Sequence, residues 1–538
     1  MVAPEDYELL GGSHLNNSTN LARNIVKQLI ELGIEDVVLS PGSRNAPLSI
    51  AFYQAENKGL VRLHVRIDER GAAFFALGIT KVTGKHVPVV CTSGTAVVNY
   101  YPAVLESYHS NNKLLLLTAD RPERLRKTGA NQTTIQKDIF GEFVRHSVDT
   151  SVPIDLEHLL KDSGPVHINL QFDEPLLPED SIDWLAGIRH KELSRPTTQK
   201  LALNVETKRN VVIVGHDRAG FEVSDIEKLV DDLGAVLVTE DPLRFKGAIA
   251  HTPIFLSDDR VRAELKAELA VVIGRTTLSR STNSYISGAE KVIVIDPRTA
   301  DVDSARSADE VLTSIPRIES KIEVDDLWVK SWKKNEELIK EVVTNYPEWS
   351  EGSLAAQISA DLEDDVALFI SSSRPIRDFE AFAAPRANVI TYANRGLAGI
   401  DGNISTAMGI ASHHAETYAV LGDLAFLHDI SALSNPTQDV LTIIVVDNDG
   451  GGIFSTLPQK DVEGFEKIFG TPHGVDIARV VAGFGVSHEV VTSKKELQIA
   501  LKRIHPTLHV IVAKMPDRKL NAHYLYQALE KYKGLVTF

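Results

Sequence analysis

Cysteine is almost absent from this chain: Cys91 is the single one among 538 residues. One thiol excludes an internal disulfide and is typical of proteins in a reducing compartment, so we expect a cytoplasmic protein. Cys91 ends an apolar run at residues 87–91. We therefore interpret it as a small buried side chain, with a catalytic thiol as the less favoured alternative.

Long apolar runs and an excess of basic residues are also absent. No stretch of about 18 uninterrupted apolar residues occurs, so we expect no membrane span. Residues 1–7 lack the basic and apolar segments of a secretory signal. The formal net charge is −16, whereas nucleic-acid binding needs clustered Lys and Arg, and this argues against a nucleic-acid partner.

The chain does contain enough hydrophobic residues, 43% of the total, for several cores. Short apolar runs alternate with helical patterns, for example at residues 71–83 and 95–109, which is the rhythm of parallel α/β domains. The predicted strands cover residues 36–40, 63–67, 87–91, 113–118 and 166–170; then 211–215, 235–239, 269–273 and 292–295; then 366–370, 417–421, 441–446 and 508–513. We predict an α/β protein with three doubly wound parallel-sheet domains at residues 1–185, 186–345 and 346–538.

Two segments outside the strands help to define this organisation. Asn16 to Asn20 offer N-caps for a helix that Gly33 ends. Residues 186–209 are polar, contain Arg195-Pro196-Thr197-Thr198 and are interpreted as a linker. The charged stretch 322–349 has a helical pattern and is expected to bridge the second and third domains.

The third domain contains a pair of oxygen-bearing residues that indicates a cofactor. Asp423 follows the apolar run 417–421, and Asn448 follows the run 441–446, with a helix predicted at 424–433. Both residues are then expected at the carboxyl ends of parallel strands, where doubly wound sheets bind ligands. With the carbonyls of the glycine-rich segment 449–452, they predict a hard oxygen site for Mg2+ carrying a diphosphate.

In the first domain, Glu69 follows a predicted strand and begins a helix with few charges, at residues 71–78. The sequence supports capping of the helix and catalysis equally for this carboxylate. Thr92-Ser93-Gly94-Thr95 occupies an equivalent position after the next strand along the chain. Those hydroxyls and N–H groups could bind a polar ring or an anion, although a simple helix cap is the favoured interpretation of the segment by itself.

Basic and polar side chains follow other strands, and their convergence would suit a small substrate with carboxylates. These candidates are Ser43, Arg44, Arg121 and Gln132 in the first domain, and Ser373, Arg377 and Arg395 in the third. Ile453, Phe454 and Leu457 offer apolar surface for a ring, with core packing as their alternative role. In the middle domain, residues 215–220 lack the glycine spacing of a dinucleotide-binding turn, so a structural role is favoured there.

Taken together, these motifs resemble the thiamine diphosphate enzymes, and more narrowly one family. That family is 2-succinyl-5-enolpyruvyl-6-hydroxy-3-cyclohexene-1-carboxylate synthase, the MenD family of menaquinone biosynthesis. The similar segments are Ser40-Pro41-Gly42-Ser43-Arg44, Asp68-Glu69-Arg70-Gly71, Thr92-Ser93-Gly94-Thr95-Ala96, Thr118-Ala119-Asp120-Arg121-Pro122, Gly129-Ala130-Asn131-Gln132, Asn394-Arg395-Gly396, Gly399-Ile400-Asp401-Gly402, Gly422-Asp423 with Asn448, and Gly451-Gly452-Ile453-Phe454. They occur in order along essentially the whole chain.

The resemblance implies a transferase with three domains of the thiamine diphosphate type and a defined set of site residues. It would decarboxylate 2-oxoglutarate and add the resulting carbanion to isochorismate, and it would form a homodimer or homotetramer. The implied catalytic residues are Glu69, Ser43, Arg44, Gln132, Arg377 and Arg395. The implied cofactor contacts are Glu69, Thr92, Ser93, Gly94, Ser373, Ile400, Gly422, Asp423, Leu424, Asn448, Gly451, Ile453 and Phe454. The implied substrate contacts are Ser43, Arg44, Arg121, Gln132, Arg280, Arg377, Arg395, Ile453, Phe454 and Leu457. Asp423, Asn448 and Gly450 would hold Mg2+, with Mn2+ as the alternative ion.

The sequence departs from the family pattern at three places. Ser371-Ser372-Ser373 replaces Gly-Asn-Ser, Asp447 and Asp449 flank Asn448 where the family has Asn, and Arg280 replaces a Lys. Two alternatives to the family's function stay open at this point. One is another thiamine-dependent 2-oxo acid decarboxylase or carboligase, and the other is a catalytically silent metabolite-binding relative.

Overall fold

The computed structural model of the chain describes residues 17–189, 201–298, 303, 307–320, 322–435 and 437–536. The segment at residues 1–7, Asn16 and the expected linker motif Arg195–Thr198 lie outside the described residues. The described residues form two compact units: unit 1 contains those within 1–108 and 112–194, and unit 2 contains those within 109–111 and 195–538. No helix among the described residues combines the length and the apolar character needed to cross a bilayer.

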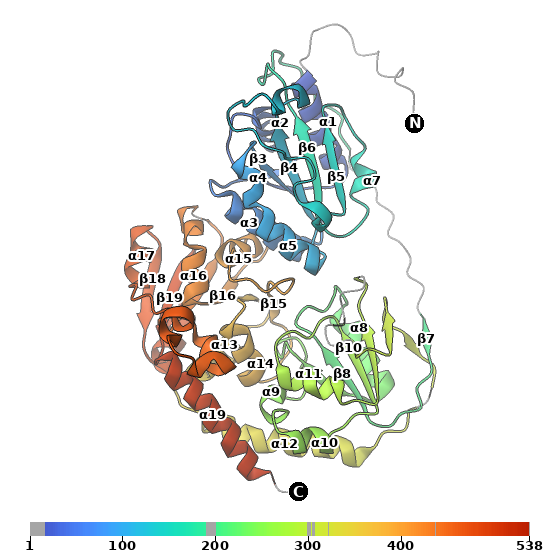
Figure 1. Cartoon of the computed structure of the whole chain (residues 1–538), viewed down its shortest axis with the longest axis vertical. Coiled ribbons are helices and arrows are strands. Elements are labelled where there is room, and N and C mark those ends of the chain that lie inside the picture. The colour runs from blue at the N-terminus through green and yellow to red at the C-terminus, as the bar shows by residue number, and fades with distance from the viewer. Residues whose placement is uncertain are drawn as a thin grey trace. The chain divides into compact units, whose positions relative to one another are not determined.

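Unit 1 contains a six-stranded, all-parallel sheet in the order β2-β1-β3-β4-β6-β5. Figure 1 labels its strands β3, β4, β5 and β6. Its strands are β1 Asp36–Leu39, β2 Arg62–Val65, β3 Val87–Cys91, β4 Leu114–Asp120, β5 His146–Thr150 and β6 Val166–Gln171. Its helices are α1 Asn17–Glu31, α2 Ala46–Asn57, α3 Glu69–Thr83, α4 Thr95–Asn99, α5 Tyr101–Ser110, α6 Glu123–Arg126 and α7 Leu156–Leu159. Helices α1, α2 and α7 share a core with the sheet, and α3 packs against β1, β3 and β4.

Unit 2 begins with a five-stranded parallel sheet in the order β12-β11-β10-β8-β9. These strands are β8 Asn210–Val214, β9 Val236–Thr239, β10 Leu269–Ile273, β11 Lys291–Ile295 and β12 Glu310–Leu312. The accompanying helices are α8 Val223–Leu233, α9 Thr252–Phe255, α10 Asp259–Glu264 and α11 Arg280–Ser287. A short ladder joins β7 Ala202–Leu203 to β13 Arg317–Ile318, and the long helix α12, Asp326–Thr344, leads to the next sheet.

The second sheet of unit 2 has six parallel strands in the order β15-β14-β16-β17-β19-β18. They are β14 Ala367–Ile370, β15 Ile390–Tyr392, β16 Thr417–Gly422, β17 Leu441–Asp447, β18 Ser487–Val491 and β19 His509–Lys514. The helices are α13 Glu351–Asp361, α14 Arg374–Phe382, α15 Asn403–Ala411, α16 Asp423–His428, α17 Ile477–Gly483, α18 Lys494–Leu501 and α19 Arg518–Leu535. Short 3-10 and π segments at Ile430–Ser434, Gly452–Thr456, Pro458–Asp461 and Glu466–Gly470 complete it.

The two six-stranded sheets follow the same path. If the strands of each sheet are numbered in chain order, both run 2-1-3-4-6-5, and the five-stranded sheet runs 2-1-3-4-5. In each sheet the direction of winding therefore reverses between the first and third strands, and ligand sites of doubly wound sheets lie at such a point.

Two predicted helices differ from those observed. The helix expected at 95–109 is two helices, α4 and α5, because Pro102 near the start of α5 has no N–H to continue the α-helical hydrogen bonds. The helix expected at 424–433 ends at His428 and continues as a 3-10 segment from Ile430. The central strands lie within one or two residues of the predicted runs, and the α/β class is confirmed.

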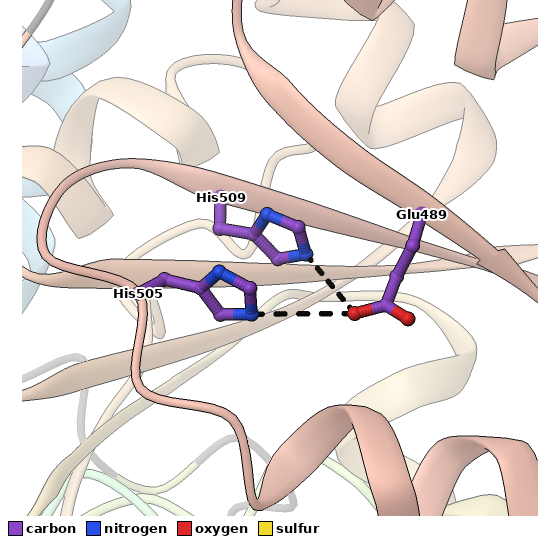
Figure 2. A group of neighbouring side chains, drawn as sticks. All are labelled: Glu489, His505 and His509. Carbon is purple, nitrogen blue, oxygen red and sulfur yellow. Dashed lines mark ion pairs between the residues drawn. The ribbon is translucent and has the colours of Figure 1, made fainter.

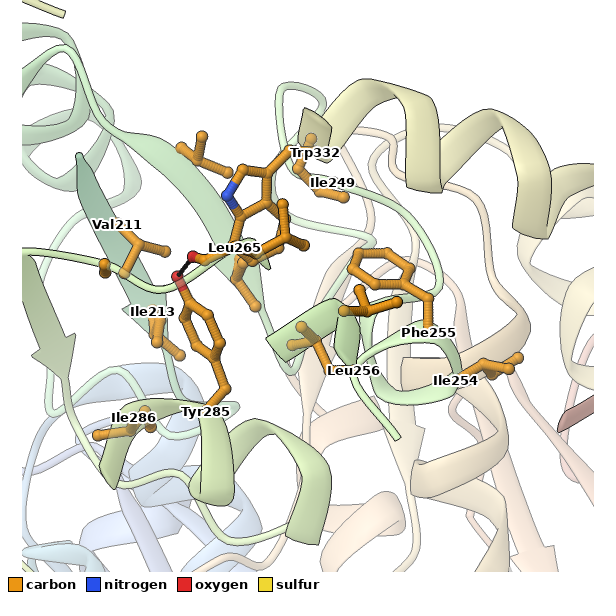
Figure 3. Close-up of a cluster of buried hydrophobic side chains, with 14 of the residues drawn as sticks. Val211, Ile213, Ile249, Ile254, Phe255, Leu256, Leu265, Tyr285, Ile286 and Trp332 are labelled. Atoms are coloured by element: carbon orange, nitrogen blue, oxygen red, sulfur yellow. Dashed lines mark hydrogen bonds between the residues drawn. The ribbon is translucent and has the colours of Figure 1, made fainter. Parts of the chain in front are cut away.

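One hydrophobic cluster spans both sheets of unit 2 and explains why they form one compact unit. Trp332 of α12 is fully buried and packs edge-on against Phe255 and Tyr285 (Figure 3). It packs in the same way against Trp328. The same cluster includes Phe382 of α14 and residues of α19. Helix α12 is thus the apolar joint between the two sheets.

Shortening Trp332 should loosen this joint. Trp332→Ala is expected to lower the free energy of unfolding of unit 2 by about 3–5 kcal/mol, because it leaves a large cavity. Trp332→Phe should cost much less, since it keeps a ring and removes an indole N–H that lacks a hydrogen-bond partner among the described residues. Urea denaturation followed by circular dichroism measures both. Equal losses for the two variants would contradict the packing argument.

Candidate active site

In unit 1 the expected site loops follow β1 and β3, the strands between which the winding reverses. The backbone N–H of Arg44, after β1, donates to the Thr92 hydroxyl, after β3, at 3.3 Å. The Arg44 guanidinium donates to the carbonyl of Phe172 at 3.1 Å and pairs with Glu174 at 3.3 Å. Ser43 is exposed beside it. The structure therefore brings together two loops that are about 50 residues apart in sequence.

Ser93, Arg121 and Gln132 form one hydrogen-bonded network in unit 1. Ser93 and Gln132 exchange two bonds, Oγ to the Gln132 carbonyl at 2.9 Å and Nε2 to the Ser93 carbonyl at 3.0 Å. Arg121 Nη1 donates to Ser93 Oγ at 3.2 Å and to the Gln132 carbonyl at 2.9 Å. The side chain of Gln136, which the sequence reading missed, is buried and accepts from Gly94 N at 3.0 Å. Gly94 is the N-cap of α4, but no side chain makes a capping hydrogen bond there, so helix capping does not account for the hydroxyls of residues 92–95.

Glu69 is the first residue of α3, and it does not cap that helix. The cap is Asp68, whose Oδ1 accepts from the N–H groups of Arg70 at 3.0 Å and Gly71 at 3.5 Å. Glu69 is half-buried. Nearby Cys91 is fully buried, and its pKa is raised, chiefly by burial and further by the negative charge of Glu69. The thiol is therefore a poor nucleophile, in agreement with its interpretation as a small packed residue.

In unit 2, Asp423 and Asn448 lie at the carboxyl ends of the adjacent parallel strands β16 and β17. Asp423 Oδ2 accepts from the backbone N–H groups of Asn448 at 3.2 Å and Gly450 at 2.8 Å. Its Oδ1 accepts from Leu424 N at 2.6 Å. Burial raises the pKa of the Asp423 carboxyl, and the Gly450 and Leu424 N–H groups act in the opposite direction. The predicted placement of both residues at the carboxyl ends of parallel strands is confirmed.

Asn448 is oriented by a buried acid that the sequence reading missed. Its Nδ2 donates to Glu351 Oε1 at 2.5 Å, and Glu351 Oε2 accepts from Arg374 Nε at 3.2 Å. Arg374 in turn pairs with Asp378. Asn448 Oδ1 is buried and has no hydrogen-bond partner among the described residues. An orphaned amide oxygen beside a buried carboxylate is a donor set that fits a hard divalent cation.

The glycine-rich segment after Asn448 packs tightly against the π segment Glu466–Gly470. Gly450 has φ +135°, and a Cβ there would lie 2.1 Å from the carbonyl oxygen of Gly470. Gly451 N donates to the same oxygen at 2.8 Å, and the Phe454 ring packs on Phe469 at 5.3 Å. Ile453 and Leu457, in and just after this segment, are partly exposed. Ile400, in the loop that precedes α15, is partly exposed as well.

His473 also lies at this site, again without a signal in the sequence reading. Its Nε2 is 3.3 Å from Asp423 Oδ2, and one ligand atom each of Asp423, Asp447 and His473 lie within 4.8 Å of one another. A single His after a turn carries no pattern that would have singled it out.

The two acidic departures from the family pattern have their own partners. Asp447 pairs with Lys514 Nζ at 2.5 Å. Asp449 Oδ1 accepts from the N–H groups of His473 at 3.0 Å and Gly474 at 2.8 Å. Although partial burial opposes it, these bonds lower the pKa of Asp449. The extra charges are therefore locally compensated.

Arg377 and Arg395 lie together around the serine segment 371–373. Arg395 is buried and donates to Ser372 Oγ at 3.3 Å and to Thr277 Oγ1 at 2.6 Å, and Arg377 donates to the Ser373 carbonyl at 2.6 Å. Ser373 itself has φ +75°. Two buried acids that the sequence reading missed, Glu240 and Glu380, act electrostatically on both arginines. Burial, and then the charge of Glu240, raises the pKa of Glu380.

Arg280 differs from the other expected substrate contacts. It is the exposed first residue of α11 and follows the N-cap Ser279. It takes no part in the hydrogen bond between Arg395 and Thr277. Its proposed role in substrate binding stays a prediction.

Three family models match the chain in sequence. They are the N-terminal TPP binding domain of thiamine pyrophosphate enzymes at residues 19–140, the middle domain of thiamine pyrophosphate enzymes at 179–370, and the C-terminal TPP binding domain at 378–513. A solved benzoylformate decarboxylase from Polynucleobacter necessarius shares the fold, with a TM-score of 0.67 at 16% identity over 92% of this chain and 98% of that one. The three thiamine-type α/β domains are thereby confirmed, whereas the residue boundaries proposed for them stay predictions.

Three relatives carry the name 2-succinyl-5-enolpyruvyl-6-hydroxy-3-cyclohexene-1-carboxylate synthase. The one from Saccharopolyspora erythraea is 36% identical over 92% of this chain and 95% of its own length. The protein from a Nocardioides species is 38% identical over 93% and 94%, and that from Lysinibacillus sphaericus is 32% identical over 90% and 93%. The chain belongs to this synthase family. The resemblance read from the motifs is confirmed, and thiamine diphosphate is the cofactor that the family's domains bind.

Replacing Glu351 by Gln tests how Asn448 is oriented in this synthase. A glutamine has one carbonyl oxygen in place of the two carboxylate oxygens that accept from Asn448 and Arg374. We expect this oxygen to accept from the charged Arg374. We expect Asn448 then to turn its amide, so that a nitrogen replaces Oδ1 as the atom without a partner. The affinity for thiamine diphosphate with Mg2+ should fall by about tenfold or more.

Calorimetric titration of the purified protein measures this affinity, and Glu348→Gln, at an exposed position three residues away by subtraction, is the matched control. Unchanged binding in Glu351→Gln would show that Asn448 needs no such partner.

Proposed function

We propose that this protein decarboxylates 2-oxoglutarate and transfers the remaining four-carbon unit to the ring alkene of isochorismate. The products are CO2 and 2-succinyl-5-enolpyruvyl-6-hydroxy-3-cyclohexene-1-carboxylate, an intermediate of menaquinone biosynthesis. Family membership over more than 90% of the chain carries this proposal. The site chemistry supports it, because both substrates are dicarboxylates and the site loops hold several arginines in an otherwise acidic protein.

In unit 1, we assign substrate binding to Ser43, Arg44, Arg121 and Gln132. The hydrogen bonds among Arg121, Ser93 and Gln132 hold the Gln132 loop against the loop after β3. Arg44 is anchored by the Phe172 carbonyl, so its guanidinium keeps a defined position at the rim of the sheet. Anchored guanidiniums bind carboxylates with less loss of side-chain entropy than exposed ones.

In unit 2, Arg377 and Arg395 are the corresponding carboxylate-binding candidates. Burial lowers the pKa of Arg377, with the charge of Arg395 acting in the same direction, so the pair favours an anion beside it. Ser373, Ile453, Phe454 and Leu457 would orient and enclose the substrate, and the exposed Arg280 would contribute from helix α11 of the middle domain.

Family resemblance assigns each end of the cofactor to a different group of residues. Glu69, with Thr92, Ser93 and Gly94, would bind the aminopyrimidine. Asp423, Asn448 and the Gly450 carbonyl would hold Mg2+ or Mn2+ for the diphosphate, next to Gly422, Leu424 and Gly451, and Ile400 would support the ring system. When bound, thiamine diphosphate supplies the electron sink that makes the loss of CO2 from a 2-oxo acid feasible. The Glu69 carboxyl would hold and move a proton at the aminopyrimidine.

We further propose that the active protein is a homodimer or homotetramer in which each cofactor contacts two chains. The segment that leads into Glu69 supports this, because Val65 is 53% exposed and Ile67 is 66% exposed. Apolar side chains at such a position are typical of surfaces that a partner covers.

A reconstituted reaction tests the function. The purified protein with Mg2+, thiamine diphosphate, 2-oxoglutarate and isochorismate should yield the six-membered-ring product, identified by its mass, and should depend on isochorismate. Turnover of 2-oxoglutarate at the same rate without isochorismate would identify a different thiamine-dependent decarboxylase.

Glu69→Gln should bind the diphosphate end normally and lose most of its activity, by about 100-fold or more, because general acid–base contributions are of that size. Glu123→Gln is the control, since Glu123 is also the first, acidic residue of a helix and is exposed. Near-normal turnover in Glu69→Gln with intact cofactor binding would contradict its assignment.

Arg395→Lys tests recognition of the dicarboxylate. The ammonium cannot reproduce a planar, bidentate contact, so kcat/KM for 2-oxoglutarate should fall by about tenfold or more. Turnover of 2-oxobutyrate, a monocarboxylate, should change much less, and the exposed Arg479→Lys should change neither. Equal losses for both 2-oxo acids would mean that Arg395 does not bind the distal carboxylate.

A further inference from the structure

A second group of side chains of metal-binding type, in which His509 is buried and Glu489 and His505 are partly exposed, lies at the other end of the sheet that contains β18 and β19. Glu489 is on β18, His509 begins β19, and His505 is in the loop between α18 and β19. His509 pairs in register with Thr442 of β17, five residues before Asp447 by subtraction. At the rise of a β-strand this is about 16 Å, so the group is separate from the Asp423 site.

Three ligand atoms converge there without ordinary hydrogen bonds. Glu489 Oε1, His505 Nε2 and His509 Nε2 are buried and have no hydrogen-bond partner among the described residues. The two nitrogens lie 4.0 Å and 3.4 Å from Glu489 Oε1, and all three atoms are within 4.8 Å of one another (Figure 2). Ligands of a tetrahedral Zn2+ with bonds of about 2.0–2.1 Å lie roughly 3.3 Å apart, so the distance between Glu489 Oε1 and His509 Nε2 already suits the ion and His505 has to move.

The neighbours of these residues leave the right atoms available. The Ser487 hydroxyl lies 2.9 Å from His509 Nδ1, and the partner of Glu489 Oε2 is Arg503 Nη1 at 2.7 Å. When Nδ1 donates to Ser487, the lone pair of the ring is on Nε2, which is the atom that faces Glu489.

We propose that Glu489, His505 and His509 form a binding site for Zn2+, with water as the fourth ligand. The two imidazole rings are stacked, with centroids 3.5 Å apart and planes 2° from parallel. Two rings in that arrangement cannot both direct their lone pairs at one ion, so binding turns the His505 ring out of the stack. His505 can turn because it lies in a loop and its side chain is 18% exposed. The ion then ties this loop to the edge strand β18.

The test is a Zn2+ titration of the full-length protein saturated with Mg2+ and thiamine diphosphate, which occupy the Asp423 site. We expect one Zn2+ per chain and a higher unfolding temperature with the ion. Glu489→Gln and His505→Gln should each weaken Zn2+ binding by about tenfold or more and should remove the thermal shift. Co2+ in place of Zn2+ should give the intense visible absorption of a tetrahedral site in the wild type.

His488→Gln is the control, because His488 lies on the same strand next to Glu489 and its Nδ1 is occupied by the Val486 carbonyl. It should bind Zn2+ as the wild type does and keep the same activity. The proposal is overturned if the saturated wild type takes up no Zn2+, or if His505→Gln and Glu489→Gln bind it as tightly as the wild type. Zn2+ uptake that His473→Gln abolishes and His505→Gln leaves unchanged would also overturn it, by locating the ion at the Asp423 site.

Discussion

The reversal of winding between the first and third strands is the constraint on which the rest of the structure depends. In the six-stranded sheet of unit 2 those strands are β14 and β16, and the segments after them contain Ser371–Ser373 and Asp423. In the first sheet they are β1 and β3, followed by Arg44 and Thr92. The chain leaves such a pair of strands in opposite directions, so a crevice opens between the two loops. Sequence segments that lie far apart become neighbours for this reason alone.

A crevice needs side chains with defined orientations, and buried charges provide them here. Asn448 is turned by Glu351, which is held by Arg374, which is paired with Asp378. Burial raises the pKa of Asp378 to about 7, so its ionised carboxylate would be costly to bury without the charge of Arg374. Replacing buried ion pairs by apolar residues often leaves stability unchanged or improves it. We therefore interpret these charged groups as orienting the site rather than stabilising the fold. Their burial lowers the stability of the folded protein.

How much the sequence could predict depended on burial. Strands covered on both faces, such as β3 and β17, are continuous apolar runs, and the predicted limits are within one residue of those observed. The edge strands β5, β12, β15 and β18 were missed, because they are short and half-exposed and therefore carry mixed polar sequences. Asp423 and Asn448 were predictable because each follows an apolar run.

The supporting residues could not be found in the same way. Glu351 is 97 positions from Asn448, on a different helix, and its role arises only when the sheet and α13 pack together. The same holds for His473, Glu240 and Gln136, whose significance is tertiary. A single sequence shows which residue types end its strands, but it does not show which distant side chains contact them.

The middle sheet illustrates how a similar topology can serve a different purpose. It has the same order in its first four strands, and a glycine, Gly215, directly follows β8 as in nucleotide-binding folds. Here, however, a Cβ on Gly215 would lie 2.2 Å from the carbonyl oxygen of Arg275, because the chain itself packs against that turn. A phosphate could not approach the same backbone. Together with the apolar joint made by α12, this close packing favours a structural role for the middle domain, which also holds Thr277 against Arg395.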